Sequence, residues 1–428
     1  MLVFLGASAF LENPAIGAPL DAEGVVREAV LRNHDLKAAR AQVDAALGRL
    51  KQAGLWSNPR LELSNETDQP FANEGEYSRS VGFSQDFPIS GRLGRAEDVA
   101  RVDVARALAE VNEVERKLIG DVAAAFSDLV AIDQKQAIRD QLIGTLEGFV
   151  IASKARYKAG EVSELDVNAA TLELLRLKQE HTRLAGEREA AIRTLAGLSG
   201  FGVNDALPLD TKLPPLKEPS PAAQLITQAI ERRPDLRLLA LSADRADAER
   251  ALASASAWED WTVGLGVRRG RNVIEGAPPQ PTDDALMMTL AIPVPLFNRN
   301  EGSKASAAAE SNAAREQHTA LSQRIENEVA GLRERAVRLL EAVKVYQQEA
   351  LPLSRKNSET ARNAYRSGQV SIAEVVQAER QENEIGMTYA ETLAQLLKTN
   401  ADLDAATVAQ IEIMTHPVTA ADNKAGER

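Results

Sequence analysis

Apolar side chains recur along this chain with two different periods, one of seven residues and one of two. The period of seven is sustained in two long stretches, through Val111, Leu118, Ala125 and Ile132, and through Ile325, Leu332, Leu339 and Tyr346. Such heptads are typical of long helices that pack as coiled coils. They predict one helix over about 94–157 and another over about 302–365. Both are far longer than the ~11–12 residues of an average globular helix.

The period of two predicts four strands, in which apolar residues alternate with small or polar ones. These segments are Pro59–Asp68, Ser80–Phe87, Trp261–Arg268 and Leu286–Ile292. Two structures explain the alternation: a small antiparallel sheet lying on the helices, or a membrane β-barrel with its apolar face toward lipid. Strands of this length suit an outer membrane, but the smallest barrel has ~8 strands. A barrel would therefore require several chains.

One unit of about 200 residues occurs twice. The segment Tyr157-Lys-Ala-Gly160-Glu-Val-Ser163 returns 208 residues later as Tyr365-Arg-Ser-Gly368-Gln-Val-Ser371, and His34-Asp35-Leu36 returns as Pro234-Asp235-Leu236. Each copy is predicted to hold a first helix, two strands, a long helix and a return helix. The first helices are expected over Ala22–Trp56 and Ala222–Ala257, and the return helices over Ser163–Leu195 and Ser371–Met414. The predicted domains are a signal-peptide remnant (1–20), repeat 1 (21–206), a Pro-rich linker (207–221), repeat 2 (222–414) and a polar tail (415–428).

The repeated turn has the composition of a tight helical hairpin. Gly160 and Gly368 suit the left-handed residue that follows a helix, where a Cβ atom would be unfavourable. Ser163 with Asp166, and Ser371 with Glu374, match the capping box that opens a helix. The sequence therefore predicts two capped helical tips.

Composition excludes several classes of function. The net charge of −12 disfavours nucleic-acid binding, and the absence of cysteine excludes disulfides, thiol catalysis, Fe–S clusters and cysteine-ligated zinc. The four histidines form no H-x-x-x-H pair, and no P-loop, G-x-S-x-G or dinucleotide motif occurs. We expect no enzyme activity, no cofactor and no metal site. The apolar start, Met1–Ala18, resembles the core and cleavage region of a secretory signal without its basic residues, although a frayed apolar terminus would look similar.

Taken together, the repeat, the four strands, the long helices and the paired Y-x-x-G-x-V-S turns resemble the TolC family of outer-membrane channel-tunnels. The likeness extends over the whole chain after about Leu20, and Ile292–Asn300 with Gly302 resembles the strand-to-helix junction of the CzcC-like heavy-metal branch. It implies a mixed α/β membrane protein of a Gram-negative bacterium, a homotrimer with a 12-stranded β-barrel in outer-membrane lipid and an α-barrel in the periplasm. It also implies passive efflux, with heavy-metal cations as substrates and with a periplasmic adaptor (membrane fusion) protein and an inner-membrane pump of the RND type as partners.

The resemblance assigns roles to residues of the two tips. The tip turns that would contact the adaptor hold Tyr157, Gly160, Ser163, Tyr365, Gly368 and Ser371, and the acidic ring at the pore entrance would consist of Asp166 and Glu374. The family pattern of TolC has a basic residue two places after the second glycine, where this chain has Val370, so a basic latch is not expected there. The alternative interpretation is a coiled-coil scaffold outside any membrane, which binds partners through its hairpins. A passive porin is disfavoured because porins lack long helical seams.

Overall fold

The structure is a computed structural model that describes residues 19–409, except 70, 72, 73, 206, 275 and 279. The predicted signal remnant, up to residue 18, and the polar tail lie outside the described residues. The chain divides into two compact units, which we name the hairpin unit and the sheet unit. The hairpin unit comprises Met1–Lys37, Val114–Arg233 and Arg324–Arg428, and the sheet unit comprises Ala38–Glu113 and Pro234–Gln323. Each unit therefore draws on both halves of the sequence.

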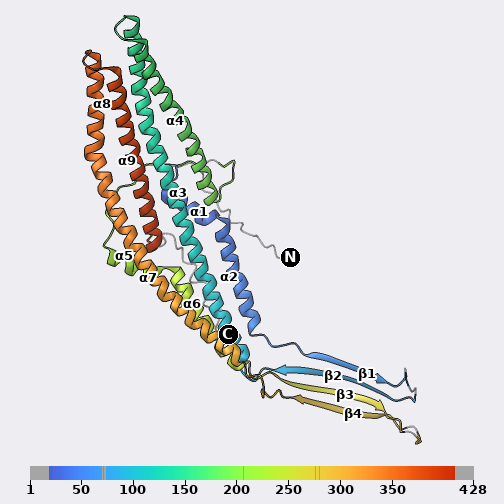
Figure 1. The fold of residues 1–428 in the computed structure, drawn as a ribbon. Helices are drawn as coiled ribbons and strands as arrows, with labels where there is room; N and C mark the ends of the chain where they lie inside the picture. The colour runs from blue at the N-terminus through green and yellow to red at the C-terminus, as the bar shows by residue number, and fades with distance from the viewer. Residues whose placement is uncertain are drawn as a thin grey trace, which may run out of the picture. The chain divides into compact units, whose positions relative to one another are not determined.

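Both halves of the chain follow the same order of elements, except that the single long helix of the first half is divided into three segments in the second (Figure 1). The first half holds α1 (Ala22–Arg32), α2 (His34–Ala53), β1 (Arg60–Thr67), β2 (Tyr77–Phe87), α3 (Arg92–Lys158) and α4 (Glu164–Leu198). The second half holds α5 (Ala222–Arg232), α6 (Pro234–Ala255), β3 (Trp261–Arg271), β4 (Asp283–Ala291), α7 (Glu301–Val345), η1 (Tyr346–Ala350), α8 (Leu351–Arg366) and α9 (Ile372–Thr407). This order confirms the tandem repeat.

The prediction of one continuous first helix per repeat was wrong, because each is broken after its first three turns. Asn33 interrupts the first, and its side-chain oxygen accepts a hydrogen bond from the backbone N–H of Leu36 (3.0 Å), which caps α2. In the second repeat, Pro234 begins α6 directly after Arg233. A proline lacks the N–H group that a continuous helix needs, but it suits the first position of a new one. The repeated His34-Asp35-Leu36 and Pro234-Asp235-Leu236 motifs are thus helix starts.

The two long helices differ in continuity. α3 runs unbroken from Arg92 to Lys158, as predicted, whereas the second long stretch contains the π-turn η1 between α7 and α8. Pro352 lies one residue inside α8, and it can neither donate to the preceding turn nor avoid the carbonyl group four residues back. The backbone widens instead, so that the N–H of Leu351 bonds to the carbonyl of Tyr346.

The heptad seams predicted the buried side of these helices. Val329, Ala336 and Val343 are fully buried in α7. Leu332 and Leu339, in the parallel series, are half-buried. One seam is thus buried and the next is partly buried. This is expected for a helix that packs against several neighbouring helices.

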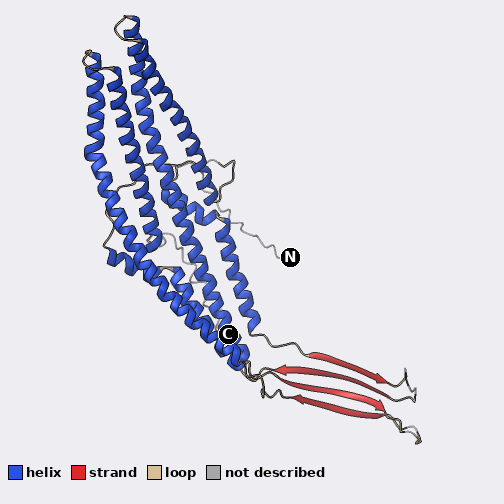
Figure 2. Ribbon diagram, in the orientation of Figure 1, coloured by secondary structure: helices blue, strands red, loops and turns tan. Residues whose placement is uncertain are grey.

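All four strands form one antiparallel sheet in the order β1-β2-β3-β4 (Figure 2). The pairing of β2 with β3 joins the two repeats, with Val81 opposite Val267 and Gly82 opposite Gly266. The register puts most of the large apolar side chains on one face: Leu61, Leu63, Val81, Phe83, Val263, Leu265, Val267, Leu286, Met288 and Leu290. The other face is mostly small or polar. None of the described helices covers the apolar face, since residues such as Leu286 (79%) and Met288 (76%) are largely exposed.

Candidate functional site

The first tip is a helical hairpin whose turn is closed by backbone and side-chain caps. Gly160 has a φ of +77°, and the N–H groups of Gly160 and Glu161 bond to the carbonyls of Tyr157 and Arg156 (2.9 and 3.0 Å). These two bonds form the Schellman motif that ends a helix. Ser163 then caps α4: the N–H of Asp166 donates to its hydroxyl, and its own N–H donates to the Asp166 carboxylate (3.2 and 3.1 Å). The predicted capping box is present.

The second tip repeats the turn but not the capping box. Gly368 has a φ of +73°, and the N–H groups of Gly368 and Gln369 bond back to Tyr365 and Ala364 (3.0 and 2.8 Å). At the start of α9, however, the Ser371 side chain makes no bond to the backbone. Its hydroxyl lies 3.3 Å from the Glu374 carboxylate instead. The expected second capping box was therefore wrong. The serine hydroxyl bonds to the carboxylate at both tips (2.7 Å at the first), but at the second tip the first N–H groups of α9 gain no side-chain partner from Ser371.

The two tyrosines of the repeated motif lie in opposite environments. Tyr365 is buried (5% exposed), with its ring 5.0 Å from that of Phe149, while Tyr157 is 44% exposed. Because their local sequences and turns match, the difference arises from what packs against them. Tyr365 faces the other hairpin of the same chain, and no described residue covers Tyr157 in the same way.

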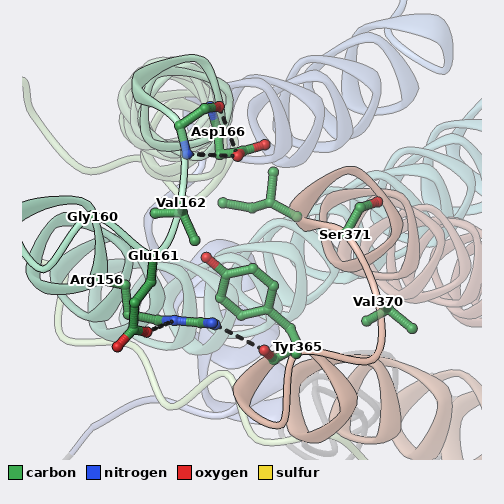
Figure 3. Close-up of a pocket in the computed structure, with 11 residues that line it drawn as sticks. Arg156, Gly160, Glu161, Val162, Asp166, Tyr365, Val370 and Ser371 are labelled. Carbon is green, nitrogen blue, oxygen red and sulfur yellow. Dashed lines mark hydrogen bonds and ion pairs between the residues drawn. The ribbon is translucent and has the colours of Figure 1, made fainter.

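Arg156 holds the two hairpins together at Tyr365 (Figure 3). Its guanidinium carbon lies 4.7 Å above the Tyr365 ring, and Nη1 donates to the Tyr365 carbonyl (2.8 Å). Nε donates to the Glu161 carboxylate (2.9 Å), which orients the side chain. We call this contact the clamp. Only the first repeat can supply it, because the position equivalent to Arg156 in the second repeat is Ala364. Arg156 is not among the residues predicted from the sequence, in which the Arg/Ala difference between the repeats is the signal for it.

Six of the eight predicted tip residues line one open hollow of about 370 Å³ between the hairpins. They are Gly160, Ser163 and Asp166 from the first tip and Tyr365, Gly368 and Ser371 from the second. Tyr157 and Glu374 do not line it. The Tyr365 hydroxyl is buried at this hollow without a hydrogen-bond partner among the described residues. The structure therefore brings the two tips together, but the two carboxylates that the resemblance assigned to one ring have different surroundings: Asp166 is half-buried and capping, and Glu374 is exposed.

Further along the hairpins, buried charges connect the two repeats. The Glu173 carboxylate, on α4, accepts hydrogen bonds from Arg176 and from Arg380 of α9 (2.9 Å for the latter). Burial acts to raise the pKa of Glu173, but the bonds from the two arginines outweigh it and hold the pKa below its usual value. At Glu379, which pairs with Arg362 inside the second repeat, the balance is reversed: burial raises the pKa, the nearby Glu382 carboxylate adds to this, and Arg362 only partly opposes it. Sequence reasoning missed both sites, because hairpin pairing alone brings these side chains together.

The described residues contain no group of three or more potential metal ligands among histidine and carboxylate side chains. Among the same residues, no helix is both long enough and apolar enough to cross a membrane.

Comparison with known proteins decides the family. The sequence profile of the family described as "Outer membrane efflux protein" matches residues 25–201 and 225–408, which is most of the chain. The chain belongs to this family. The efflux channel is thereby located in the outer membrane, with its helical part in the periplasm, and it is not an enzyme. The match excludes the alternative of a coiled-coil scaffold outside the membrane.

Two curated relatives resemble the channel in sequence. It is 23% identical over 302 residues to "Cobalt-zinc-cadmium resistance protein CzcC" of Cupriavidus metallidurans, covering 71% of this chain and 69% of that protein. It is also 23% identical over 274 residues to "Pyoverdine export outer membrane protein OpmQ" of Pseudomonas aeruginosa, covering 60% and 58%. The alignment thus spans little more than half of the second relative.

Solved structures show the same fold as the channel. A crystal structure of CusC aligns with a TM-score of 0.71 at 18% identity, covering 90% of this chain and 91% of CusC. VceC of Vibrio cholerae aligns with a TM-score of 0.68 at 18% identity, covering 90% and 95%.

Proposed function

We propose that this channel is a homotrimer whose three sheets close one twelve-stranded barrel through the outer membrane. We further propose that it receives its cargo from a periplasmic adaptor protein and an inner-membrane pump of the RND type. In this assembly the six tip hairpins would form the periplasmic entrance. The turns around Gly160 and Gly368 would contact the adaptor.

One observation carries this proposal: the sheet is open at both edges and exposes a continuous apolar face. β1 and β4 each have one partner among the described strands, and their outer edges present unpaired backbone groups. Unpaired edges cannot lie in lipid, where each unsatisfied backbone group costs several kcal/mol. Pairing β1 of one chain with β4 of another satisfies both edges, and closure turns the apolar face toward lipid.

The mass of the purified protein in detergent tests the assembly. We expect a particle of three chains that loses solubility when the detergent is removed. A monodisperse monomer that remains soluble without detergent would contradict the trimer and the barrel together.

As cargo we propose heavy-metal cations. The similarity to a cobalt-zinc-cadmium resistance protein supports this class. So does the acidic balance of the chain, together with the Asp166 and Glu374 carboxylates at its tips. The ions would pass through the channel without being retained.

A further inference from the structure

The apolar face of the sheet ends abruptly in a row of arginines. Arg79 of β2 lies directly opposite Arg269 of β3, on the same face as Val81 and Val267 and one step closer to the strand connections. Asn65 of β1 and Asp284 of β4 complete the row. The next row on this face adds Arg271 opposite Tyr77.

These arginines are only partly neutralised within the chain. Arg269 makes a two-pronged ion pair with Asp284 (2.6 and 2.8 Å), which uses the only carboxylate of the row. Arg79 donates Nε to Asn65 (3.0 Å), and its guanidinium carbon lies 5.4 Å from the centre of the Tyr77 ring. Among the described residues, Arg79 forms no ion pair with a carboxylate. Arg271 donates two bonds to the carbonyl of Gly75 (2.9 and 2.7 Å), and its guanidinium carbon lies 5.8 Å from the centre of the Tyr77 ring. It forms no ion pair with a carboxylate of the described residues.

Two cations directly opposite each other destabilise a sheet unless an anion lies between or beside them. The row of Arg79 and Arg269 holds two positive charges and one negative charge, and Arg271 adds a third positive charge in the next row. This part of the sheet therefore has the chemistry of an anion site. Guanidinium groups also match the geometry of phosphate oxygens.

The opposite end of the same face has a different character. It carries Phe87 opposite Trp261, and the Phe87 ring meets Trp56 edge to face at 5.8 Å. Trp261 and Arg269 are separated by eight residues, or roughly 26 Å along the strand, comparable with the ~25 Å apolar band of a membrane barrel. Aromatic residues thus mark the end joined to the helices, and arginines mark the end joined to the strand connections. Because the helices lie in the periplasm, the arginine end faces the outer leaflet.

We propose that Arg79, Arg269 and Arg271 form a binding site for the phosphate groups of an anionic lipid in the outer leaflet. The acyl chains would lie along the adjoining apolar rows, and Tyr77 would occupy the headgroup level, as aromatic rings do at membrane interfaces. The inference rests on the proposed barrel, because only the closed barrel turns this face toward lipid.

Native mass spectrometry of the assembled protein in detergent tests the site, with bisphosphorylated lipid A and its dephosphorylated form as probes. We expect the phosphorylated lipid to bind more tightly and Arg79→Gln to weaken that binding about fivefold, the equivalent of ~1 kcal/mol for one arginine near a charged surface. Arg268→Gln is the matched control, since Arg268 adjoins Arg269 on β3 but lies on the opposite face. We expect it to bind the lipid like the unaltered protein.

Equal affinity of the unaltered protein for the two lipids would overturn the proposal, as would equal losses in Arg79→Gln and Arg268→Gln. The lipid comparison needs no variant, so it decides the question even if Arg79→Gln fails to assemble. Failure of this site is distinguishable from failure of the barrel, because a trimer that requires detergent and binds both lipids alike contradicts only the lipid site.

Discussion

Tyr157 and Tyr365 show how one motif can serve two purposes. Each lies in the last turn of its long helix, three residues before a left-handed glycine, and its carbonyl accepts one bond of a Schellman turn. Only Tyr365 is buried, under the guanidinium group of Arg156. In a ring of alternating hairpins, the first tip of one chain would meet the second tip of its neighbour without this clamp, because Ala364 replaces the arginine. Contacts between chains at the tip would then lack the arginine contact that joins the two hairpins of one chain.

Replacing Arg156 tests the clamp. We expect Arg156→Ala to separate the hairpins more often, since the change removes a cation–π contact and a hydrogen bond, together worth about 1–2 kcal/mol. The absence of cysteine allows spin labels to be attached only at introduced Lys158→Cys and Arg366→Cys. The distance distribution between the labels should broaden in Arg156→Ala. Lys154→Ala, an exposed change on the same helix, should leave the distribution unchanged, and equal broadening in both variants would contradict the clamp.

The acidic side chains of the tips give a second prediction at this scale. The double variant Asp166→Asn with Glu374→Gln removes the charges but keeps groups that can accept hydrogen bonds. If the carboxylates attract cations at the entrance, the variant should assemble normally yet lose cation preference and cation block in single-channel recordings. If they serve only as caps, selectivity should persist and thermal stability should fall slightly. That second result would remove Asp166 and Glu374 from the functional residues.

At the scale of the element, the residues of each strand alternate between the two faces of the sheet, one apolar and one small or polar. Gly82 and Gly266 are paired on the small face, and a Cβ on Gly266 would lie 2.8 Å from the Val81 carbonyl oxygen. The glycines thus permit close backbone approach there. On the other face, exposed valine, leucine and phenylalanine side chains have no covering helix. The alternation therefore separates a face of exposed apolar side chains from a face on which glycine allows close backbone approach.

Arginine substitutions at adjacent positions of β3 test this division. Val263→Arg should block assembly, because a charge on the lipid face is unfavourable, by up to the ~2–4 kcal/mol that it costs at mid-membrane. Thr262→Arg should be tolerated, since Thr262 lies on the opposite face and bonds to Asp86 (2.7 Å), which would pair with the new cation. The yield of detergent-stable oligomer measures both. Equal yields from the two variants would contradict the assigned faces.

For the whole molecule, membership of the outer membrane efflux protein family establishes a channel and leaves its cargo as a proposal. The two curated relatives are named for different cargoes, metal ions in one case and pyoverdine in the other. Neither the family nor the fold separates these cases.

Growth of the host with this gene deleted tests the cargo. Heavy-metal export predicts that the deletion lowers the tolerated concentration of cobalt, zinc or cadmium salts several-fold, and that the intact gene restores it. Val263→Arg, which should not assemble, serves as the inactive control for restoration. Unchanged metal tolerance accompanied by retention of a siderophore would replace metal cations with an organic cargo.

The sequence by itself determined the repeat, the helical seams, the strands and the tip turns. Each of these follows from local periodicity or from a backbone requirement, as at Gly160 and Gly368, whose positive φ suits glycine. Local rules failed where two signals competed. The heptads predicted one helix through Pro352, but the missing N–H group of the proline required a π-turn. The capping-box pattern predicted that the Ser371 hydroxyl would accept a hydrogen bond from the backbone of α9. In the structure this hydroxyl bonds to the Glu374 carboxylate.

Only the tertiary structure decided which matching residues of the two repeats have the same surroundings and which have different ones. Arg156 over Tyr365, Glu173 between Arg176 and Arg380, and Arg79 opposite Arg269 join residues that are distant in sequence or on different strands. No periodicity encodes such contacts, because they depend on how hairpins and strands pair. The physical reason is the range of the forces: helix and turn formation depend on neighbours within a few residues, whereas burial and charge pairing depend on whatever the folded chain brings within a few ångströms.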